Sequence, residues 1–276
     1  MKIVDVHTHV FPPEVIKKRE EICEKDPGFS ALYSKKSSVM VDIEGINTYM
    51  KSEGIYCVGV LSFPFKDKGL LSLCNDYVTS LASRSDILPF VMVDFRSEKW
   101  SERELERCFG KGARGVGEIS FYSGEFGGKE FERLNGIADF LQEKDGVLLL
   151  HVNEQVGHPY SGKIRVDFES LYEFVKKKQG LKIILAHLGG GICFYEFMPE
   201  VKEVFKNVFY DTAATPFLYS KDIYPFIASY LSEKVLFGSD FPLLSFSRYK
   251  DDLYEISGKK RELVLFKNAA KLFNLS

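Results

Sequence analysis

The chain has 276 residues, of which 45% are hydrophobic, and this length and composition suit one barrel-sized domain. Its 37 basic and 39 acidic residues leave a formal net charge of −2, which excludes a strong electrostatic field for a nucleic-acid backbone or an anionic membrane. We therefore expect a small-molecule substrate, no nucleic-acid partner and no membrane partner, while the sequence leaves the oligomeric state open, a homodimer included. The N-terminal MKIVDVHTHV lacks the apolar core of a signal peptide, and the five cysteines are scattered without a C-x-x-C pair. Both features favour a cytoplasmic protein.

Eight short apolar runs along the chain predict β-strands. Their near-continuous hydrophobicity is typical of parallel strands that are buried on both faces. The runs span residues 3–7, 55–63, 87–95, 113–120, 146–152, 181–188, 208–213 and 235–240.

Amphipathic segments lie between these runs and predict helices. Residues 41–54, 131–144 and 168–180 carry apolar side chains at three- and four-residue spacing. Alternating strands and helices predict an α/β fold, a (β/α)8 TIM barrel in which residues 1–276 form a single domain. The alternative is an open, doubly wound sheet.

Two stretches interrupt this alternation. Residues 11–40 are inserted between the first strand and its helix, and residues 153–167 form a long polar loop after the fifth strand. Because long segments of this kind in compact domains tend to be functional, we expect both to cover an active site.

His7 and His9 lie two residues apart on the first strand. Since strand side chains alternate between faces, Asp5, His7 and His9 are expected to point together into the barrel, with Val4, Val6 and Thr8 pointing out. Two imidazoles side by side suit a divalent cation of borderline softness. Taken alone, the H-x-H pattern also fits two ordinary polar residues at a strand end.

His151, His187 and Asp240 each follow an apolar strand and precede a loop that contains glycine or proline. The carboxyl ends of barrel strands converge on one face, where catalytic residues gather. One histidine there could be an ordinary core residue, but four histidines and an aspartate gathered from four strands predict a metal site. We expect zinc first, with manganese or iron as alternatives.

The segments DVHTHVFP, AHLGGG, GSDFP and NAAKLF, together with His151, resemble the amidohydrolase superfamily along the whole chain. The resemblance is narrower to the amidohydrolase-related (amidohydrolase 2-like) metal-dependent hydrolases of the TIM-barrel fold. That group includes aromatic-acid and aminocarboxymuconate-semialdehyde decarboxylases. The resemblance implies that His7, His9, His151 and Asp240 bind the metal.

The same resemblance implies two catalytic residues. His187 would bind the metal or polarise the substrate, and Asp240 would bind the metal and also carry a proton.

Glu118 ends the fourth predicted strand, in GVGEIS. Binuclear relatives place a bridging carboxylated lysine or glutamate at this point, so Glu118 could join two cations. Alternatively, it orients a histidine by accepting its hydrogen bond. The sequence therefore predicts one or two divalent cations per chain.

A cation at this site would lower the pKa of bound water and polarise a carbonyl group. Asp240 beside it could move a proton from that water to the leaving group. These features predict a hydrolase acting on an amide, lactone or ester bond of a small substrate, with or without a carboxylate. Decarboxylation is the first alternative, and a non-catalytic metal-binding barrel is the second. The retained H-x-H favours hydrolysis, because some related decarboxylases begin with E-x-H.

Five further residues are candidates for substrate binding. Arg96 follows the third strand and suits a carboxylate, although a surface salt bridge explains it equally well. His158, Tyr160 and Lys163 belong to the loop after His151, where ordinary loop polarity is the alternative. Phe63 follows the second strand and could form an apolar wall of the pocket, with core packing as the alternative.

Overall fold

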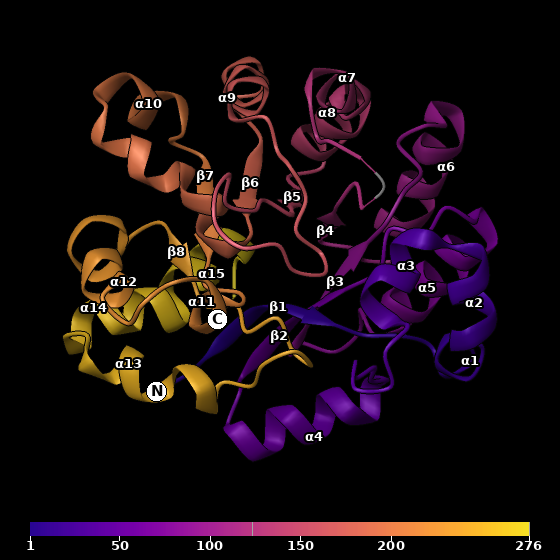
Figure 1. The fold of residues 1–276 in the computed structure, drawn as a ribbon, viewed down its shortest axis with the longest axis horizontal. Helices are drawn as coiled ribbons and strands as arrows, with labels where there is room; N and C mark the ends of the chain where they lie inside the picture. Colours follow the sequence, from indigo (N-terminus) through magenta and orange to yellow (C-terminus); the bar gives the residue numbers. More distant parts are fainter. Residues whose placement is uncertain (123, 276) are drawn as a thin grey trace.

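The computed structural model describes residues 1–122 and 124–275, and it contains one parallel sheet of eight strands in the order β1 to β8 (Figure 1). Each strand pairs with the next in the sequence, so the sheet curls into the predicted barrel and the open, doubly wound alternative is wrong. The strands are β1 (Val4–His9), β2 (Cys57–Leu61), β3 (Ile87–Val91), β4 (Gly115–Ile119), β5 (Val147–Leu150), β6 (Lys182–Leu185), β7 (Val208–Asp211) and β8 (Val235–Leu236).

Helices surround the barrel and join successive strands (Figure 1). Several begin at an aspartate whose carboxylate accepts backbone N–H groups of the first turn; Asp42, for example, accepts from Glu44 and Gly45. The helices are α1 (Pro13–Lys17), α2 (Arg19–Lys25), α3 (Pro27–Tyr33), α4 (Ile43–Glu53), α5 (Lys68–Ser80), α6 (Glu98–Phe109), α7 (Gly128–Arg133), α8 (Asn135–Glu143), α9 (Phe168–Lys177), α10 (Pro199–Val204), α11 (Thr215–Leu218), α12 (Ile223–Phe226), α13 (Ser247–Glu255), α14 (Gly258–Glu262) and α15 (Asn268–Phe273). The helix expected over 131–144 is thus two helices, α7 and α8, that meet at Leu134.

The chain that follows β8 closes the barrel against β1. The backbone N–H of Val6 donates to Phe237, that of Asp240 donates to His7, and that of His9 donates to Phe241, at 2.9, 2.9 and 2.7 Å. Closure therefore places Asp240 directly beside the two histidines of β1.

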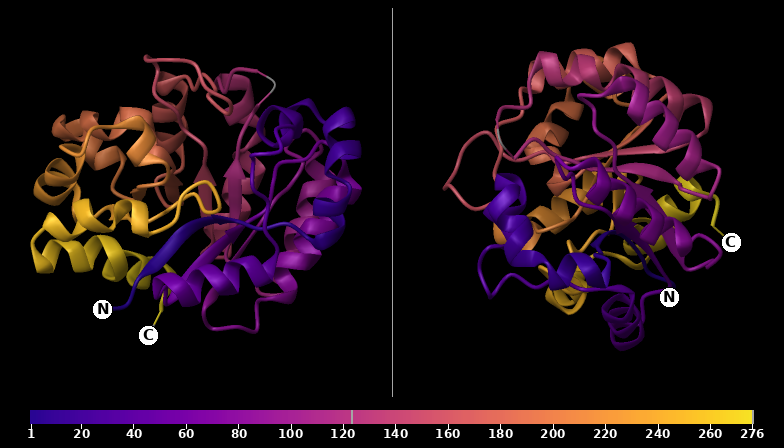
Figure 2. Two further views of the ribbon diagram at one scale, coloured as in Figure 1. Left: turned by 60° about the horizontal axis from the view of Figure 1, so that its bottom comes forward. Right: turned by 90° about the vertical axis from the view of Figure 1, so that its right-hand side faces the viewer.

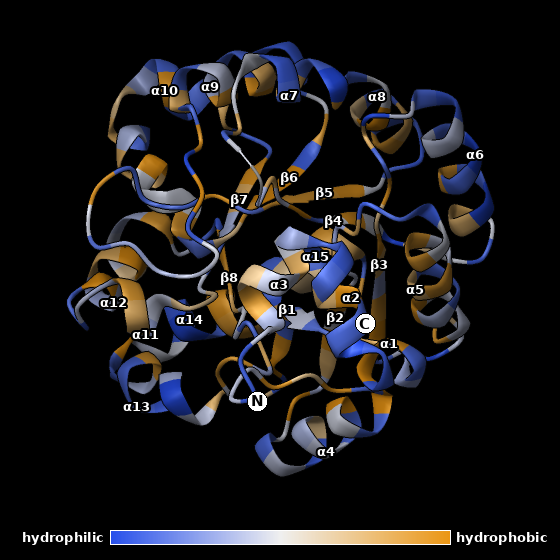
Figure 3. Ribbon diagram, turned by 45° about the vertical axis from the view of Figure 1, so that its right-hand side comes forward, coloured by the Kyte–Doolittle hydropathy of each residue, from blue (hydrophilic) through white to orange (hydrophobic). Residues whose placement is uncertain are grey.

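Two apolar layers hold the barrel. One lies between the strands and the outer helices. The strands are mostly hydrophobic, whereas hydrophobic and hydrophilic residues alternate along the helices (Figure 3). The other fills the interior, where Val4 and Val6 meet side chains of the other strands and of α15.

This packing corrects the expected orientation of β1. Val4 and Val6 face the interior, whereas Asp5 contacts Tyr49 of α4. The pairing of β1 with β2 shifts register between Asp5 and Thr8. Because one extra residue in a strand moves the following side chains to the opposite face, His7 and His9 point into the barrel mouth although Asp5 does not.

The two interruptions of the alternation are visible in the structure. Residues 11–40 contain α1, α2 and α3, and residues 153–167 form an irregular loop that pairs at Val166 with Phe126. The 153–167 loop lies at the end of the molecule opposite the two termini (Figure 2). Among the described helices, none is long and apolar enough to span a bilayer.

Candidate metal centre

Six side chains with metal-binding atoms meet at the carboxyl ends of five strands; we call them the six-ligand cluster. They form two groups, and within each group the candidate ligand atoms lie within 4.8 Å of one another. The first group is His7, His9 and Asp240, and the second is Glu118, His151 and His187. The structure therefore brings together every metal ligand expected from the sequence.

The first group combines the two histidines of β1 with the aspartate that follows β8. The Nε2 atoms of His7 and His9 are 3.2 Å apart. The Oδ1 atom of Asp240 lies 3.8 Å from His7 Nε2 and 3.2 Å from His9 Nε2.

The second group contains Glu118, whose two carboxylate oxygens face different groups. Oε1 lies 2.7 Å from His151 Nδ1 and 3.4 Å from His187 Nε2. Oε2 faces the first group, 3.8 Å from His7 Nε2 and 3.9 Å from His9 Nε2. Glu118 thus lies between the two groups.

Hydrogen bonds on the far side of three imidazole rings orient them. His7 Nδ1 donates to Asp211 Oδ2 at 2.8 Å, and His187 Nδ1 donates to the Ala213 carbonyl at 2.9 Å. His151 is turned the other way, with its Nε2 donating to the Gly162 carbonyl at 2.9 Å. Each bond keeps a proton on the outer nitrogen and turns the inner nitrogen toward the cluster, where it can bind a metal once it has lost its own proton.

Two cluster residues have backbones in the left-handed region. The φ angle is 58° at His187 and 64° at Asp240. Side chains other than glycine seldom adopt this region, and it recurs at functional sites where surrounding structure holds it. At Asp240 that support is the backbone hydrogen bond to His7.

The cluster concentrates negative charge in a buried place. Burial raises the pKa of Asp240, but the hydrogen bond from His9 and the charge of His7 outweigh it and bring this pKa to about 2. For Glu118, burial raises the pKa, and the positive charges of His151 and His7 hold it well below its ordinary value. Burial lowers the pKa of His7, but the charges of Asp211 and Glu118 raise it to about 10. The ionised carboxylates thus call for positive charge beside them.

The donor set fits divalent transition metals. Two ligand atoms that share a cation at about 2.1 Å lie about 3.0–3.5 Å apart, and the neighbouring cluster atoms are 2.7–3.9 Å apart. Imidazole and carboxylate ligands from separate strands suit zinc, manganese or iron. The residues present therefore fit a metal centre.

A cavity of about 590 Å³ opens above the cluster. Three predicted substrate-binding residues, Phe63, His158 and Tyr160, line it. Five cluster residues also line it, namely His9, Glu118, His151, His187 and Asp240. His7 is completely buried beneath them.

Two predicted substrate-binding residues are engaged elsewhere. Arg96 lines a separate, smaller cavity, and its Nε donates to Asp94 Oδ1 at 2.7 Å. Arg96 thus forms a salt bridge, which is the alternative to substrate binding that the sequence left open. Lys163 lies 3.0 Å from Glu154 and donates to the carbonyls of Val156 and His158, so its ammonium ties the 153–167 loop together.

Sequence reasoning missed Asp211, the last residue of β7. It is completely buried, and its carboxylate also accepts the backbone N–H groups of His187 and Ala213 at 2.9 and 3.0 Å. A carboxylate at a strand's carboxyl end was the available signal, because such positions converge on the barrel mouth.

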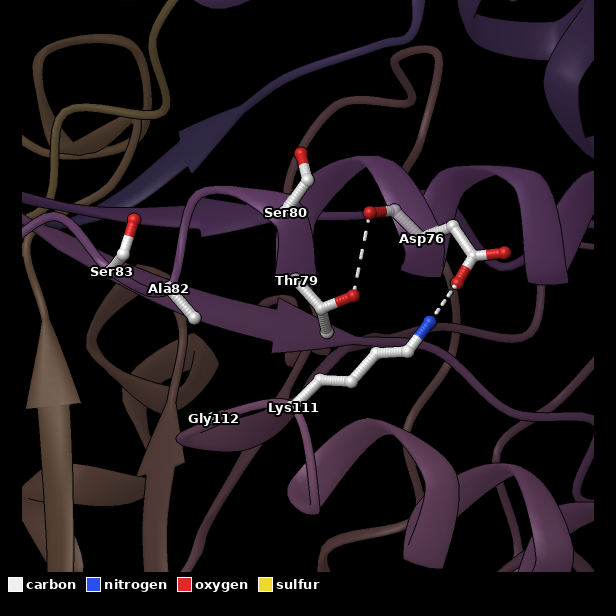
Figure 4. Close-up of a pocket in the computed structure, with 7 residues that line it drawn as sticks. All are labelled: Asp76, Thr79, Ser80, Ala82, Ser83, Lys111 and Gly112. Carbon is white, nitrogen blue, oxygen red and sulfur yellow. Dashed lines mark hydrogen bonds and ion pairs between the residues drawn. The ribbon is translucent and has the colours of Figure 1, made fainter.

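A depression on the outer surface lies at the other end of the barrel (Figure 4). Its residues precede β3 and β4, at the face where barrels carry structural rather than catalytic groups. Lys111 Nζ and Asp76 Oδ1 pair across it at 2.7 Å. The depression is lined by Asp76, Thr79, Ser80, Ala82, Ser83, Lys111 and Gly112.

The profile of the amidohydrolase family matches residues 4–275, so the chain belongs to this family. No curated protein sequence matches the chain at a significant level.

Solved structures share the fold at low sequence identity. A 5-carboxyvanillate decarboxylase from Sphingomonas paucimobilis is 14% identical with a TM-score of 0.80, and the match covers 100% of this chain and 99% of that chain. A 5-carboxyvanillate decarboxylase from Novosphingobium aromaticivorans, complexed with manganese and 4-hydroxy-3-methoxy-5-nitrobenzoic acid, is 16% identical with a TM-score of 0.76, covering 99% and 96%. A putative amidohydrolase from Staphylococcus aureus is 15% identical with a TM-score of 0.73, covering 100% of both chains.

The Asp211→Asn variant tests how the His7 ring is oriented. The amide nitrogen would face the Nδ1–H of His7, and the histidine would have to move its proton to Nε2, the atom that faces the cluster. We expect metal affinity to fall about 10- to 100-fold, measured by metal analysis after dialysis against graded zinc concentrations. The control is Asp222→Asn, an exposed carboxylate before α12. Unchanged affinity in Asp211→Asn would contradict the orienting role.

Proposed function

We propose that this protein is a metal-dependent hydrolase that cleaves an amide, lactone or ester bond of a small molecule, using two divalent cations. The observation that carries the proposal is the position of Glu118 between two groups of ligands, with one oxygen toward each. Family membership supports the metal-dependent enzyme class.

The residues that would hold the cations follow from the two groups. His7, His9 and Asp240 would hold one, His151 and His187 the other, and Glu118 would be shared by both. When bound, the cations would supply an acidified water molecule and a polarised substrate carbonyl.

Asp240 is the group best placed to move the proton. Its carboxylate lines the cavity, and its low pKa keeps it ionised at neutral pH. An ionised carboxylate at this point can accept a proton from the attacking water and return it to the leaving group. Its left-handed backbone, held by His7, fixes the carboxylate in place.

The cavity walls restrict the substrate to a small molecule with an apolar part. Phe63, Leu218 and Leu243 line the cavity beside the polar groups of the cluster. A cavity of about 590 Å³ is in the usual range for small-molecule sites. We propose zinc as the metal, on the basis of the four imidazoles, with manganese or iron as alternatives.

Decarboxylation of a small unsaturated or aromatic acid is the second candidate. It is supported by similar structures that are decarboxylases, among them the two described above, one of which carries manganese. The same cluster could bind a carboxylate and manage the proton at carbon. The H-x-H motif favours hydrolysis, because its first position is His7, whereas some related decarboxylases have a glutamate there.

A substrate panel separates the candidate functions. Protein loaded with zinc or manganese would be incubated with lactones, esters, amides and aromatic carboxylic acids. Hydrolysis predicts release of an acid, detected by pH indicator, and the second candidate predicts release of carbon dioxide. Chelation of the metal should abolish turnover in either case. No turnover on any compound with any metal would contradict both.

Asp240→Asn should lower kcat about 100-fold or more on any compound that is turned over, because the amide cannot accept the proton. The control is Asp251→Asn, an exposed carboxylate of α13, which should retain full kcat. Equal kcat in Asp240→Asn and the control would contradict a role for Asp240 in proton transfer.

Glu118→Gln tests the number of cations. The amide keeps the shape of the side chain but offers one weak oxygen in place of two charged ones, so the bound metal should fall from two ions per chain to one. Elemental analysis of protein purified without chelator measures the ratio. The matched control is Glu196→Gln, because Glu196 is equally buried but pairs with Tyr210 and Lys234. A wild-type ratio of one would contradict the two-ion proposal.

A further inference from the structure

The last residue of α3, Tyr33, lines the cavity above the six-ligand cluster. Its ring is held among other aromatic rings, stacked on Phe29 at 4.8 Å and edge-to-face with Phe11 at 5.1 Å between centroids. Phe63, on another wall of the cavity, lies 6.0 Å away. This packing leaves the ring a single position, so its hydroxyl has a fixed direction.

Both ends of α3 are tied to the rest of the protein. At its start, the Asp26 carboxylate accepts the N–H groups of Gly28 and Phe29, and also that of Lys66 beyond β2 at 3.0 Å. At its end, the Arg19 guanidinium donates to the backbone carbonyls of Tyr33 and Lys35. The helix is therefore positioned before any ligand arrives, which reduces the entropic cost of a contact made by Tyr33.

The Tyr33 hydroxyl has no hydrogen-bond partner within residues 1–122 and 124–275, although the residue is only 9% exposed. Because no side chain or backbone group of the described residues pairs with it, this hydroxyl is free to bond to a molecule that enters the cavity. Tyr160, in the same cavity, differs: its hydroxyl donates to Glu154 at 2.9 Å and accepts from Asn153 at 3.0 Å.

The surroundings keep the Tyr33 hydroxyl protonated. Burial raises its pKa, and the negative charges of Asp240 and Glu118 raise it further. A hydroxyl in this state donates a hydrogen bond, and Tyr33 lines the same cavity as Glu118 and Asp240.

We propose that the Tyr33 hydroxyl donates a hydrogen bond to an oxygen atom of a substrate bound in the cavity above the six-ligand cluster. This inference rests on the proposed metal-dependent function. It gives the inserted segment 11–40 a direct part in recognition: the substrate must present an acceptor oxygen, such as a carbonyl or carboxylate oxygen, to Tyr33 while it reaches the cluster.

The test uses acetohydroxamate, a small molecule that binds transition metals through two oxygen atoms. Its binding to the zinc-loaded full chain would be measured by isothermal titration calorimetry for wild type, Tyr33→Phe and Tyr172→Phe. The first variant removes only the hydroxyl and keeps the packed ring. The second makes the same change on the outer helix α9, where Tyr172 contacts Phe205. Zinc content and melting temperature of each variant would be measured alongside.

We expect binding to Tyr33→Phe to be about tenfold weaker, with Tyr172→Phe equal to wild type and zinc content equal in all three. Equal binding by Tyr33→Phe and wild type would overturn the role of Tyr33 and leave the metal-dependent function standing. Full zinc content with no binding by wild type would instead overturn the open metal centre, and the Tyr33 contact with it.

Discussion

The closure of the barrel between β1 and the chain after β8 is the constraint on which the site depends. Asp5, completely buried, accepts hydrogen bonds from the Ser239 backbone and hydroxyl and from Tyr49 of α4. Burial raises the pKa of Asp5 and these donors lower it, and burial outweighs them, so that the pKa is about 6. A buried carboxylate without such donors would be costly, so the same bonds that stabilise Asp5 hold residue 239 against β1. The next residue, Asp240, then reaches the histidines of β1 from the far end of the sequence.

Charge is the second consequence of this geometry. Closure collects carboxylates and imidazoles in a buried volume, where their charges act strongly on one another. Glu118 and Asp240 are held ionised, and His7 and His187 have raised pKa values of about 10 and about 9. In the metal-free chain, protons on His7 and His187 supply positive charge beside these carboxylates. Divalent cations would supply it instead and release those protons.

Much of this arrangement could be predicted from the sequence. The alternation of apolar runs with amphipathic segments indicated the barrel. The positions of His151, His187 and Asp240 after predicted strands indicated that their side chains converge at one face. Strand ends are predictable in this way because a parallel barrel places all its carboxyl ends together. The irregular step in β1 was not predictable, since a register shift depends on pairing with β2 and not on the local pattern.

The remaining differences concern side chains whose partners come from other elements. Arg96 was expected to face the substrate because it follows β3. It instead pairs with Asp94, two residues away. Asp211 orients His7 across 204 positions of sequence, and Tyr33 reaches the cavity from an inserted helix. Such roles become visible only when the tertiary contacts are known.

An anomalous difference map at the zinc edge, from crystals of the protein grown with zinc, would show directly whether Glu118 lies between two cations. We expect two peaks, one on each side of the Glu118 carboxylate, the first beside His7 and His9 and the second beside His151 and His187. A single peak, or zinc bound only outside the six-ligand cluster, would contradict it.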